Sequence, residues 1–159
     1  MRFRSELHRL ELKVPPLGIV VIAAVLMWLG AAYFRAFQFR FSFQPVIASV
    51  IGLSGALTCG LGVVQFRRAR TTVNPIKPES ASSLVRTGIY RSTRNPMYLG
   101  FLLILIGWGI ATANILGLLV LPAFVVYMNR FQIKPEERAL TAIFGDDFKA
   151  FCSSVRRWI

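Results

Sequence analysis

The chain alternates between long apolar runs and short basic segments. Of its 159 residues, Val14–Phe34 and Pro45–Phe66 are uncharged over 21 and 22 positions, and Asn95–Asn129 is uncharged over 35. A helix rises about 1.5 Å per residue, so each of the first two runs can cross a hydrocarbon core of about 30 Å. The third run is too long for one span, and small and polar residues at 111–114 ("ATAN") interrupt it. The pattern therefore predicts spans at about 14–36, 45–66, 96–112 and 114–131, the last two forming a tight hairpin.

Two further segments lie outside these runs. The segment 67–95 contains two prolines and shows no helical apolar stripe, so we expect an irregular loop. After Pro135, apolar residues such as Leu140, Ile143, Phe144 and Phe148 recur at spacings of three and four. That spacing predicts an amphipathic tail helix over 135–158, with a break at Gly145–Asp146. The expected fold is an all-α integral membrane protein, with residues 1–159 forming a single membrane domain.

The distribution of charge predicts the orientation in the membrane. The chain has 19 Lys and Arg against 7 Asp and Glu, and 55% of its residues are hydrophobic. With four spans, 17 of the basic residues fall on one side and 2 on the other. The positive-inside rule then predicts that both termini, the loop 67–95 and the tail helix are cytoplasmic, and we expect a bacterial inner membrane.

The same composition argues against several other classes of partner. The basic residues flank apolar runs and form no separate soluble domain, so the expected partner is the bilayer and its anionic headgroups, not nucleic acid. His8 is the only histidine, and Cys59 and Cys152 lie far apart in the sequence. We therefore expect no metal site, no disulfide framework and no histidine-based triad.

The most informative polar stretch directly precedes the third apolar run. In "RSTRNPMYLG", Pro96 suits the first turn of a helix, where its missing N–H has no partner, and Asn95 can cap that helix. One interpretation needs no binding site. In it, Arg91 and Arg94 only fix the orientation of the helix in the membrane, and Tyr98 is an aromatic residue at the membrane interface.

A second polar group follows the fourth predicted span. Pro135 again suggests a helix start, with Glu136 and Glu137 in its first turn, where the helix dipole favours carboxylates. If the last two spans form a hairpin, the stretch around Arg94 and Tyr98 faces these glutamates. Such a mixture of groups suits a polar, zwitterionic ligand beside an apolar partner. The alternative is an ordinary helix cap with a surface ion pair, worth about 0–1 kcal/mol.

At these residues the chain resembles a known family. The run "SSLVRTGIYRSTRNPMYLG" (82–100), then a hairpin, then "EERALTAIFGDDFKAF" (136–151) and "VRRW" (155–158), is similar to the isoprenylcysteine carboxyl methyltransferase family of integral membrane enzymes. The related phospholipid N-methyltransferases share the pattern. The resemblance covers about half of the chain. It implies cytoplasmic binding of S-adenosyl-L-methionine and methyl transfer to an amphiphilic or lipid-like acceptor, through a carboxylate, thiol or amine.

The resemblance also implies roles for individual residues. Arg94 and Glu137 correspond to catalytic or supporting positions, and Arg130 and Gln132 to substrate-binding positions. Two residues depart from the family pattern. Asn95 replaces a histidine that many members have, and Gln132 replaces an arginine that meets the substrate carboxylate in eukaryotic carboxyl methyltransferases. The implied cofactor contacts are Ser82, Ser83, Leu84, Val85, Tyr90, Asn95, Pro96, Met97, Tyr98 and Glu136.

Two other functions stay open at this point. One is a non-catalytic membrane module with the same fold that binds a lipid or thiol. The other is an NADPH-dependent enzyme similar to the sterol reductases, which share the C-terminal pattern but are usually much longer. The sequence alone does not select the acceptor atom, the oligomeric state or a catalytic base between Glu136 and Glu137.

Overall fold

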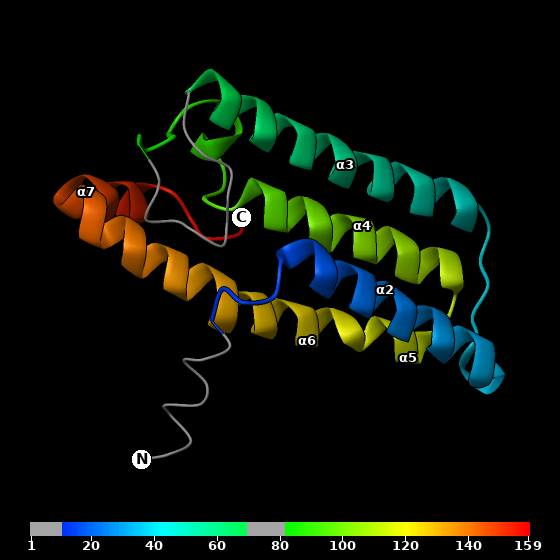
Figure 1. Ribbon diagram of the computed structural model, residues 1–159. Coiled ribbons are helices and arrows are strands. Elements are labelled where there is room, and N and C mark those ends of the chain that lie inside the picture. The colour runs from blue at the N-terminus through cyan, green and yellow to red at the C-terminus, as the bar shows by residue number, and fades with distance from the viewer. Residues whose placement is uncertain (1–10, 70–81) are drawn as a thin grey trace, which may run out of the picture.

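The chain forms an all-helical bundle, as predicted. The computed structural model describes residues 11–69 and 82–159, where the only strand-like pairing is an isolated bridge between Gln38 and Asn114. The long helices lie side by side, and the polar segments gather at one end of them (Figure 1). The elements are α2 (Pro16–Tyr33), η1 (Arg35–Phe37), α3 (Gln44–Arg68), η3 (Gly88–Arg91), α4 (Pro96–Thr112), α5 (Ile115–Leu118), α6 (Val120–Tyr127), the π-helical turn η4 (Met128–Ile133) and α7 (Lys134–Ser154).

Three of the helical segments are long and apolar enough to cross a membrane. They are α2, α3 and the joined helix Ile115–Ser154, while α4 is apolar but has 17 residues. In the joined helix, charged residues begin at Arg130, so only the part before it suits the hydrocarbon. The outward faces carry large exposed apolar side chains, such as Leu53 and Val126. Helices therefore occupy the regions where all four spans are predicted.

The third apolar run breaks at the predicted position. Ala113 has a left-handed backbone (φ 55°) and ends α4, and Asn114 caps the next helix by accepting a hydrogen bond from Leu116 N at 3.0 Å. The Asn114 side chain is fully buried and also donates to Phe34 O at 2.8 Å, which satisfies its polar atoms inside the bundle. From this turn the chain runs back alongside α4 (Figure 1).

The prediction of a separate tail helix starting at Pro135 is wrong. Ile133 and Lys134 both have helical backbone angles, so α7 continues directly from η4. Pro135 lacks an N–H and would leave the carbonyl four residues earlier without its helical partner. That carbonyl belongs to Phe131 and accepts a hydrogen bond from Leu12 N at 3.0 Å. The wider π-helical turn and the N-terminal segment together accommodate the proline.

This continuity also changes the expectation for the two glutamates. Glu136 and Glu137 follow several helical turns and do not lie at a free helix N-terminus, so the helix dipole does not account for them. The predicted break at Gly145–Asp146 is confirmed, because Gly145 has φ 53° and ψ −124°. The helix ends at Ser154, before the predicted end at 158, and Val155 is extended.

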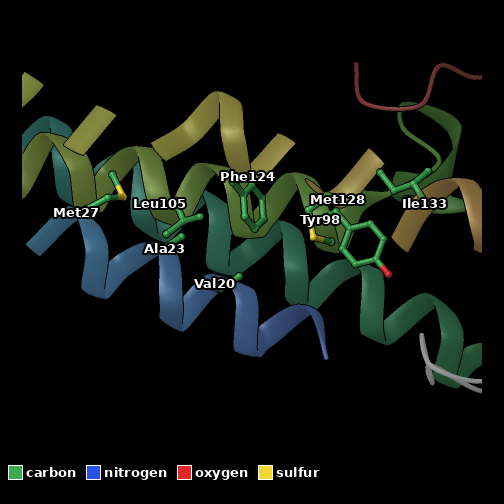
Figure 2. Packing of buried hydrophobic residues seen from close by; sticks show 8 residues of the cluster. All are labelled: Val20, Ala23, Met27, Tyr98, Leu105, Phe124, Met128 and Ile133. Atoms are coloured by element: carbon green, nitrogen blue, oxygen red, sulfur yellow. The ribbon is translucent and has the colours of Figure 1, made fainter. Parts of the chain in front are cut away.

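Two apolar clusters position the polar end of the bundle. The first lies between α2, α4, α6 and η4, and in it the ring of Tyr98 packs beside Met128 with its hydroxyl directed away from the other apolar residues (Figure 2). The second joins the segment 82–91 to α7 and contains Val85, Tyr90, Phe148 and Phe151. Segments that are distant in the sequence are thereby brought together at this end.

Candidate active site

A polar cluster lies where the apolar helices end. Its members come from the segment before α4, the first turn of α4, the beginning of α7 and the last residues of the chain. They are Tyr90, Arg94, Asn95, Tyr98, Glu136, Glu137 and Arg157.

The first contact of the cluster joins Tyr98 to Glu136. Tyr98 is 4% exposed, and its hydroxyl donates a hydrogen bond to Glu136 Oε1. Glu136 is partly buried and forms no ion pair with residues 11–69 or 82–159. Burial raises the pKa of this carboxyl to about 8, the Tyr98 hydrogen bond lowers it, and the neighbouring Glu137 charge raises it further. Glu136 is thus a carboxyl group that lacks a cation.

Tyr90 lies close to this pair. It is buried, and its ring meets Phe66 of α3 edge-on with a centroid separation of 5.5 Å. Burial and, to a lesser extent, the negative charge of Glu136 raise the pKa of Tyr90 well above its ordinary value. Tyr90 therefore keeps its proton and can act as a hydrogen-bond donor.

The second contact of the cluster holds Glu137 between two arginines. Arg94 Nη2 lies 3.1 Å from Glu137 Oε1, and Arg157 donates from Nε at 3.0 Å and from Nη2 at 2.5 Å to the two oxygens. The Arg94 side chain is 13% exposed, so this ion pair is shielded from water. The two adjacent glutamates are therefore unlike each other, since among the described residues Glu137 has two cationic partners and Glu136 has none.

Arg94 and Asn95 also contact the end of the chain. Arg94 Nη1 donates to Cys152 O at 3.1 Å, while its buried Nε has no acceptor among the described residues. Asn95 occupies the N-cap position of α4, as predicted, but its side chain accepts no hydrogen bond from that helix. The Asn95 amide instead donates to Arg157 O at 2.9 Å. Pro96 occupies the first turn of α4, as predicted.

The other predicted cofactor contacts lie mainly in packing positions. Ser83 donates to Ala69 O at 3.2 Å, and Leu84 and Val85 belong to the second apolar cluster, while Ser82 begins the described segment. Met97 faces α3, where its carbonyl accepts from Cys59 Sγ at 3.3 Å. These side chains fix the segments that carry Tyr90 and Tyr98.

The two predicted substrate residues both contact the N-terminal segment. Arg130 Nη1 pairs with Glu11 Oε1 at 2.6 Å, and Arg138 pairs with the other oxygen of Glu11. Gln132 is 0% exposed and donates to Val14 O at 2.7 Å, while its Oε1 has no donor among the described residues. Gln132 thus offers one buried, unoccupied acceptor.

An open hollow of about 450 Å³ adjoins the cluster. It is lined by Lys134, Glu137, Arg138 and Thr141, and the Thr141 hydroxyl donates to Glu137 O at 2.6 Å. Within the described ranges, no three His, Cys, Asp or Glu side chains come together as a metal site. The hollow therefore presents a carboxylate, a guanidinium group, an ammonium group and a hydroxyl group.

Sequence reasoning missed two residues of this region. Arg157 was counted only among the positive charges, although it lies in the "VRRW" run that contributed to the family resemblance. Glu11 is the other residue missed, although it is the acidic residue nearest to the first apolar run, after Glu6. An acidic residue among basic residues at a membrane boundary is a usable signal for a specific ion pair.

Comparison with known proteins identifies the family. The family model described as phospholipid methyltransferase matches residues 43–147, which is about two thirds of the chain. The chain belongs to the phospholipid methyltransferase family. Members are methyltransferases, and the match spans α3 to the middle of α7, including both glutamates and Tyr98.

Individual relatives agree with this family. Probable protein-S-isoprenylcysteine O-methyltransferases of Oryza sativa, from subspecies indica and japonica, are each 30% identical over 116 residues. Those alignments cover 71% of this chain and 59% of each rice protein, so the chain spans less than two thirds of these relatives. An uncharacterized protein of Haemophilus influenzae is 41% identical over 63 residues, which is its full length and 40% of this chain.

Proposed function

We propose that this chain is a membrane-embedded, S-adenosylmethionine-dependent methyltransferase that acts on an amphiphilic or lipid-like acceptor. The family supports methyl transfer. The observation that carries the proposal is the environment of Glu136 at the end of the apolar helices. Its carboxyl group accepts a hydrogen bond from Tyr98 and has no cationic partner among the described residues. A partly buried carboxylate without a counter-ion favours binding of a cationic group.

The residues present fit such a cofactor. Glu136 would hold its ammonium or ribose hydroxyl groups, and Arg94, whose buried Nε lacks an acceptor, would face its carboxylate. The phenol rings of Tyr90 and Tyr98 would lie near its cationic part. When bound, this cofactor supplies an electrophilic methyl group. The remaining residues carried over from the family stay proposals for the same pocket, namely Ser82, Ser83, Leu84, Val85, Asn95, Pro96 and Met97.

The chain's own contribution is to position the reactants and exclude water. Methyl transfer requires the nucleophile to be held in line with the bond that breaks, and positioning alone accelerates such steps greatly. A base is needed only when the nucleophile arrives protonated. Of the two glutamates, Glu136 is the better proton acceptor, because two arginines neutralise Glu137. Arg130 and the unpaired Gln132 Oε1 are the proposed contacts of the acceptor.

The proposed membrane arrangement has four crossings. In it, α4 and the apolar part of Ile115–Ser154 cross as a hairpin with arms of about 25 Å, and both termini face the cytoplasm. The loop Arg35–Phe43 then faces the other side, as expected for a protein of a bacterial inner membrane. The polar cluster lies at the cytoplasmic boundary, where a water-soluble donor and a membrane-soluble acceptor can both arrive.

Calorimetry on detergent-solubilised protein tests the cofactor. We expect S-adenosylhomocysteine to bind and NADPH not to bind, and Glu136→Ala to abolish binding while the protein still unfolds cooperatively. Arg86→Ala is the control, because Arg86 pairs with the exposed Asp147 outside the cluster. Heat from NADPH alone would favour the reductase alternative, and unchanged binding by Glu136→Ala would contradict the proposed pocket.

A turnover assay separates an enzyme from a binding module. Protein in detergent is incubated with methyl-labelled S-adenosylmethionine and a total membrane lipid extract, and the extracted products are analysed. Label in the organic phase that depends on Glu136 supports methyl transfer, and mass spectrometry of the labelled product then identifies the acceptor atom. Binding of the cofactor with no labelled product from lipids or from added hydrophobic thiols supports the non-catalytic alternative.

A further inference from the structure

The last residues of the chain form an extended segment that crosses the polar cluster. We name Val155–Trp158 the C-terminal strap. It begins where α7 ends, and Val155 has extended backbone angles of φ −126° and ψ 134°. The family match ends at residue 147, so the strap lies outside it.

One side of the strap is bonded to the segment that leads into α4. Arg94 N donates to Arg156 O at 3.0 Å. The carbonyl of Arg157 accepts from Thr93 Oγ1 at 3.3 Å and from the Asn95 amide at 2.9 Å. Thr93 is 2% exposed, so these bonds are shielded from competing water. The backbone of the strap is therefore fixed along the edge of the cluster.

The end of the strap is fixed to the last membrane helix. Trp158 Nε1 donates to Asn129 Oδ1 at 3.1 Å, and the Trp158 ring packs against the first apolar cluster. The strap thus joins the beginning of α4 to the helix that carries both glutamates. Arg157 stands between these two attachments and has little freedom to move.

Arg157 uses its side chain to hold both oxygens of Glu137. Two donors of one guanidinium meet two oxygens of one carboxylate, a geometry that lysine cannot reproduce. The neighbouring Arg156 is exposed, and no ion pair of its side chain occurs among the described residues. Two adjacent arginines therefore offer a matched comparison.

We propose that Arg157 is a positioning residue of the site. With Arg94, it compensates the charge of Glu137 and fixes that carboxylate, so that Glu136 remains the carboxylate available to a cationic group of the cofactor. This inference rests on the proposed function. It assigns to the strap a role in binding, beyond closing the bundle.

The surrounding charges determine the expected effect on pH dependence. Around Glu137 lie Arg94, Arg157 and Cys152, and Lys134 and Arg138 line the adjoining hollow. Glu136 is its neighbour in sequence, and Tyr98 and Tyr90 lie close to the Glu136 carboxyl. Without Arg157, only Arg94 compensates the charge of Glu137. The negative charge of Glu137 then opposes ionisation of Glu136 more strongly.

The test compares full-length variants in detergent. The affinity for S-adenosylhomocysteine is measured by calorimetry between pH 6 and pH 10 for wild type, Arg157→Gln, Arg157→Lys and Arg156→Gln. We expect the affinity of the wild-type protein to rise with pH as Glu136 ionises. In Arg157→Gln, the midpoint of this rise should lie about one pH unit higher, which weakens binding near neutral pH about tenfold. Arg156→Gln should match wild type. The midpoint of Arg157→Lys should lie between those of wild type and Arg157→Gln, because lysine restores the charge but not the bidentate contact.

Each outcome separates the inference from the proposed function. A wild-type protein that does not bind S-adenosylhomocysteine overturns both. Wild-type binding with the same midpoint in Arg157→Gln overturns the positioning role alone, even if the unfolding temperature of that variant falls. If Arg157→Gln does not fold, the pH midpoint of binding in Arg157→Lys is compared with that in Arg156→Gln. The loss of the bidentate contact should still raise the midpoint of Arg157→Lys measurably, and equal midpoints would overturn the positioning role.

Discussion

The pair Glu136 and Glu137 shows how two identical neighbours acquire different chemistry. Successive residues on a helix point about 100° apart, so the two carboxyl groups meet different surroundings. Glu137 meets Arg94 and Arg157, and Glu136 meets the Tyr98 hydroxyl. Glu137 is held between two arginines, while burial raises the pKa of Glu136 to about 8, so the charge of Glu136 changes near neutral pH.

The stability of the ligand-free protein should fall as the pH rises. The folded pKa of Glu136 is raised to about 8 from 4.5, so its contribution is fully present below pH 4.5 and is lost as the pH approaches 8. We expect the unfolding temperature to decrease across this range and to decrease less in Glu136→Gln, which cannot ionise. Differential scanning fluorimetry in detergent measures both slopes. Equal slopes in the two proteins would contradict the raised pKa.

Replacing Tyr98 by phenylalanine isolates one hydrogen bond. The ring stays in its apolar cluster, while Glu136 loses its only described donor. A hydrogen bond to a group that can ionise contributes about 1–3 kcal/mol, so we expect a loss of that order in unfolding free energy and weaker cofactor binding. Tyr127→Phe is the control, because no hydrogen bond of that hydroxyl occurs among the described residues. Chemical unfolding in detergent gives the unfolding free energies of both variants, and calorimetry with S-adenosylhomocysteine gives their affinities.

At the residue scale, the sequence predicts contacts but not hydrogen-bond partners. The proximity of Tyr98 to Glu136 and of Arg94 to Glu137 follows from a hairpin whose two ends are neighbours. The role of Asn95 does not follow, because an asparagine before a proline at a helix start normally caps. Its side-chain amide donates a hydrogen bond to the Arg157 carbonyl, which lies 62 positions later in the sequence. Local preference gives no information about a partner so far along the chain.

At the scale of elements, the close approach of α3 and α4 supports the site. These two helices share the most extensive contact of the described pairs. A Cβ added to Gly100 would lie 2.4 Å from Cys59 Sγ and 2.6 Å from Gly55 O. The backbones are therefore in near contact, as in membrane helix pairs with small residues at the interface. This contact fixes the helix whose first turn carries Tyr98.

Alanine at two glycines should give opposite results. Gly100→Ala places a methyl group against the α3 backbone and should cost about 1–3 kcal/mol, because packed helices must separate. Gly60→Ala meets nothing within 4 Å and should be neutral or slightly stabilising, since alanine is the better helix former. Unfolding temperatures of both variants in one detergent provide the comparison. Equal behaviour of the two variants would contradict the packing of α3 on α4.

The elements themselves differ in how far the sequence predicts them. Uncharged runs of membrane length predict helices reliably, and Asn114 marks the turn because a buried asparagine needs partners at a helix end. Pro135 misleads, because its usual place is the first turn of a helix. Here the Phe131 carbonyl, which Pro135 leaves without a helical donor, accepts a hydrogen bond from Leu12 N outside the helix. No local sequence pattern reveals such a distant donor.

At the scale of the whole molecule, charge is distributed unevenly between the two ends. The end opposite the polar cluster carries Arg35 and Arg40 among exposed aromatic side chains, and no acidic residue occurs between Glu11 and Glu79. Large exposed rings include those of Phe34, Phe37 and Phe43. Aromatic residues at this level fit the interface between hydrocarbon and headgroups.

Reporter fusions test the proposed orientation. A reporter after Ile159 should indicate the cytoplasm, and one inserted between Gln38 and Phe41 should indicate the opposite side, because 17 of the basic residues favour the cytoplasmic face. Paired phosphatase and fluorescent-protein fusions give complementary signals at each site. The same signal at both positions would contradict an odd number of crossings between them, and with it the four-crossing arrangement.

The bond from Leu12 to Phe131 has a consequence for biosynthesis. Leu12 leaves the ribosome before Phe131, which follows 119 residues later. At about 5–20 residues per second, this delay is roughly ten seconds. Until then the N–H of Leu12 must bond to water or a headgroup, and the Phe131 carbonyl receives its partner only when the two ends of the chain meet. The first span can therefore be inserted early, but its N-terminal segment reaches its final conformation only after the last helix has been made.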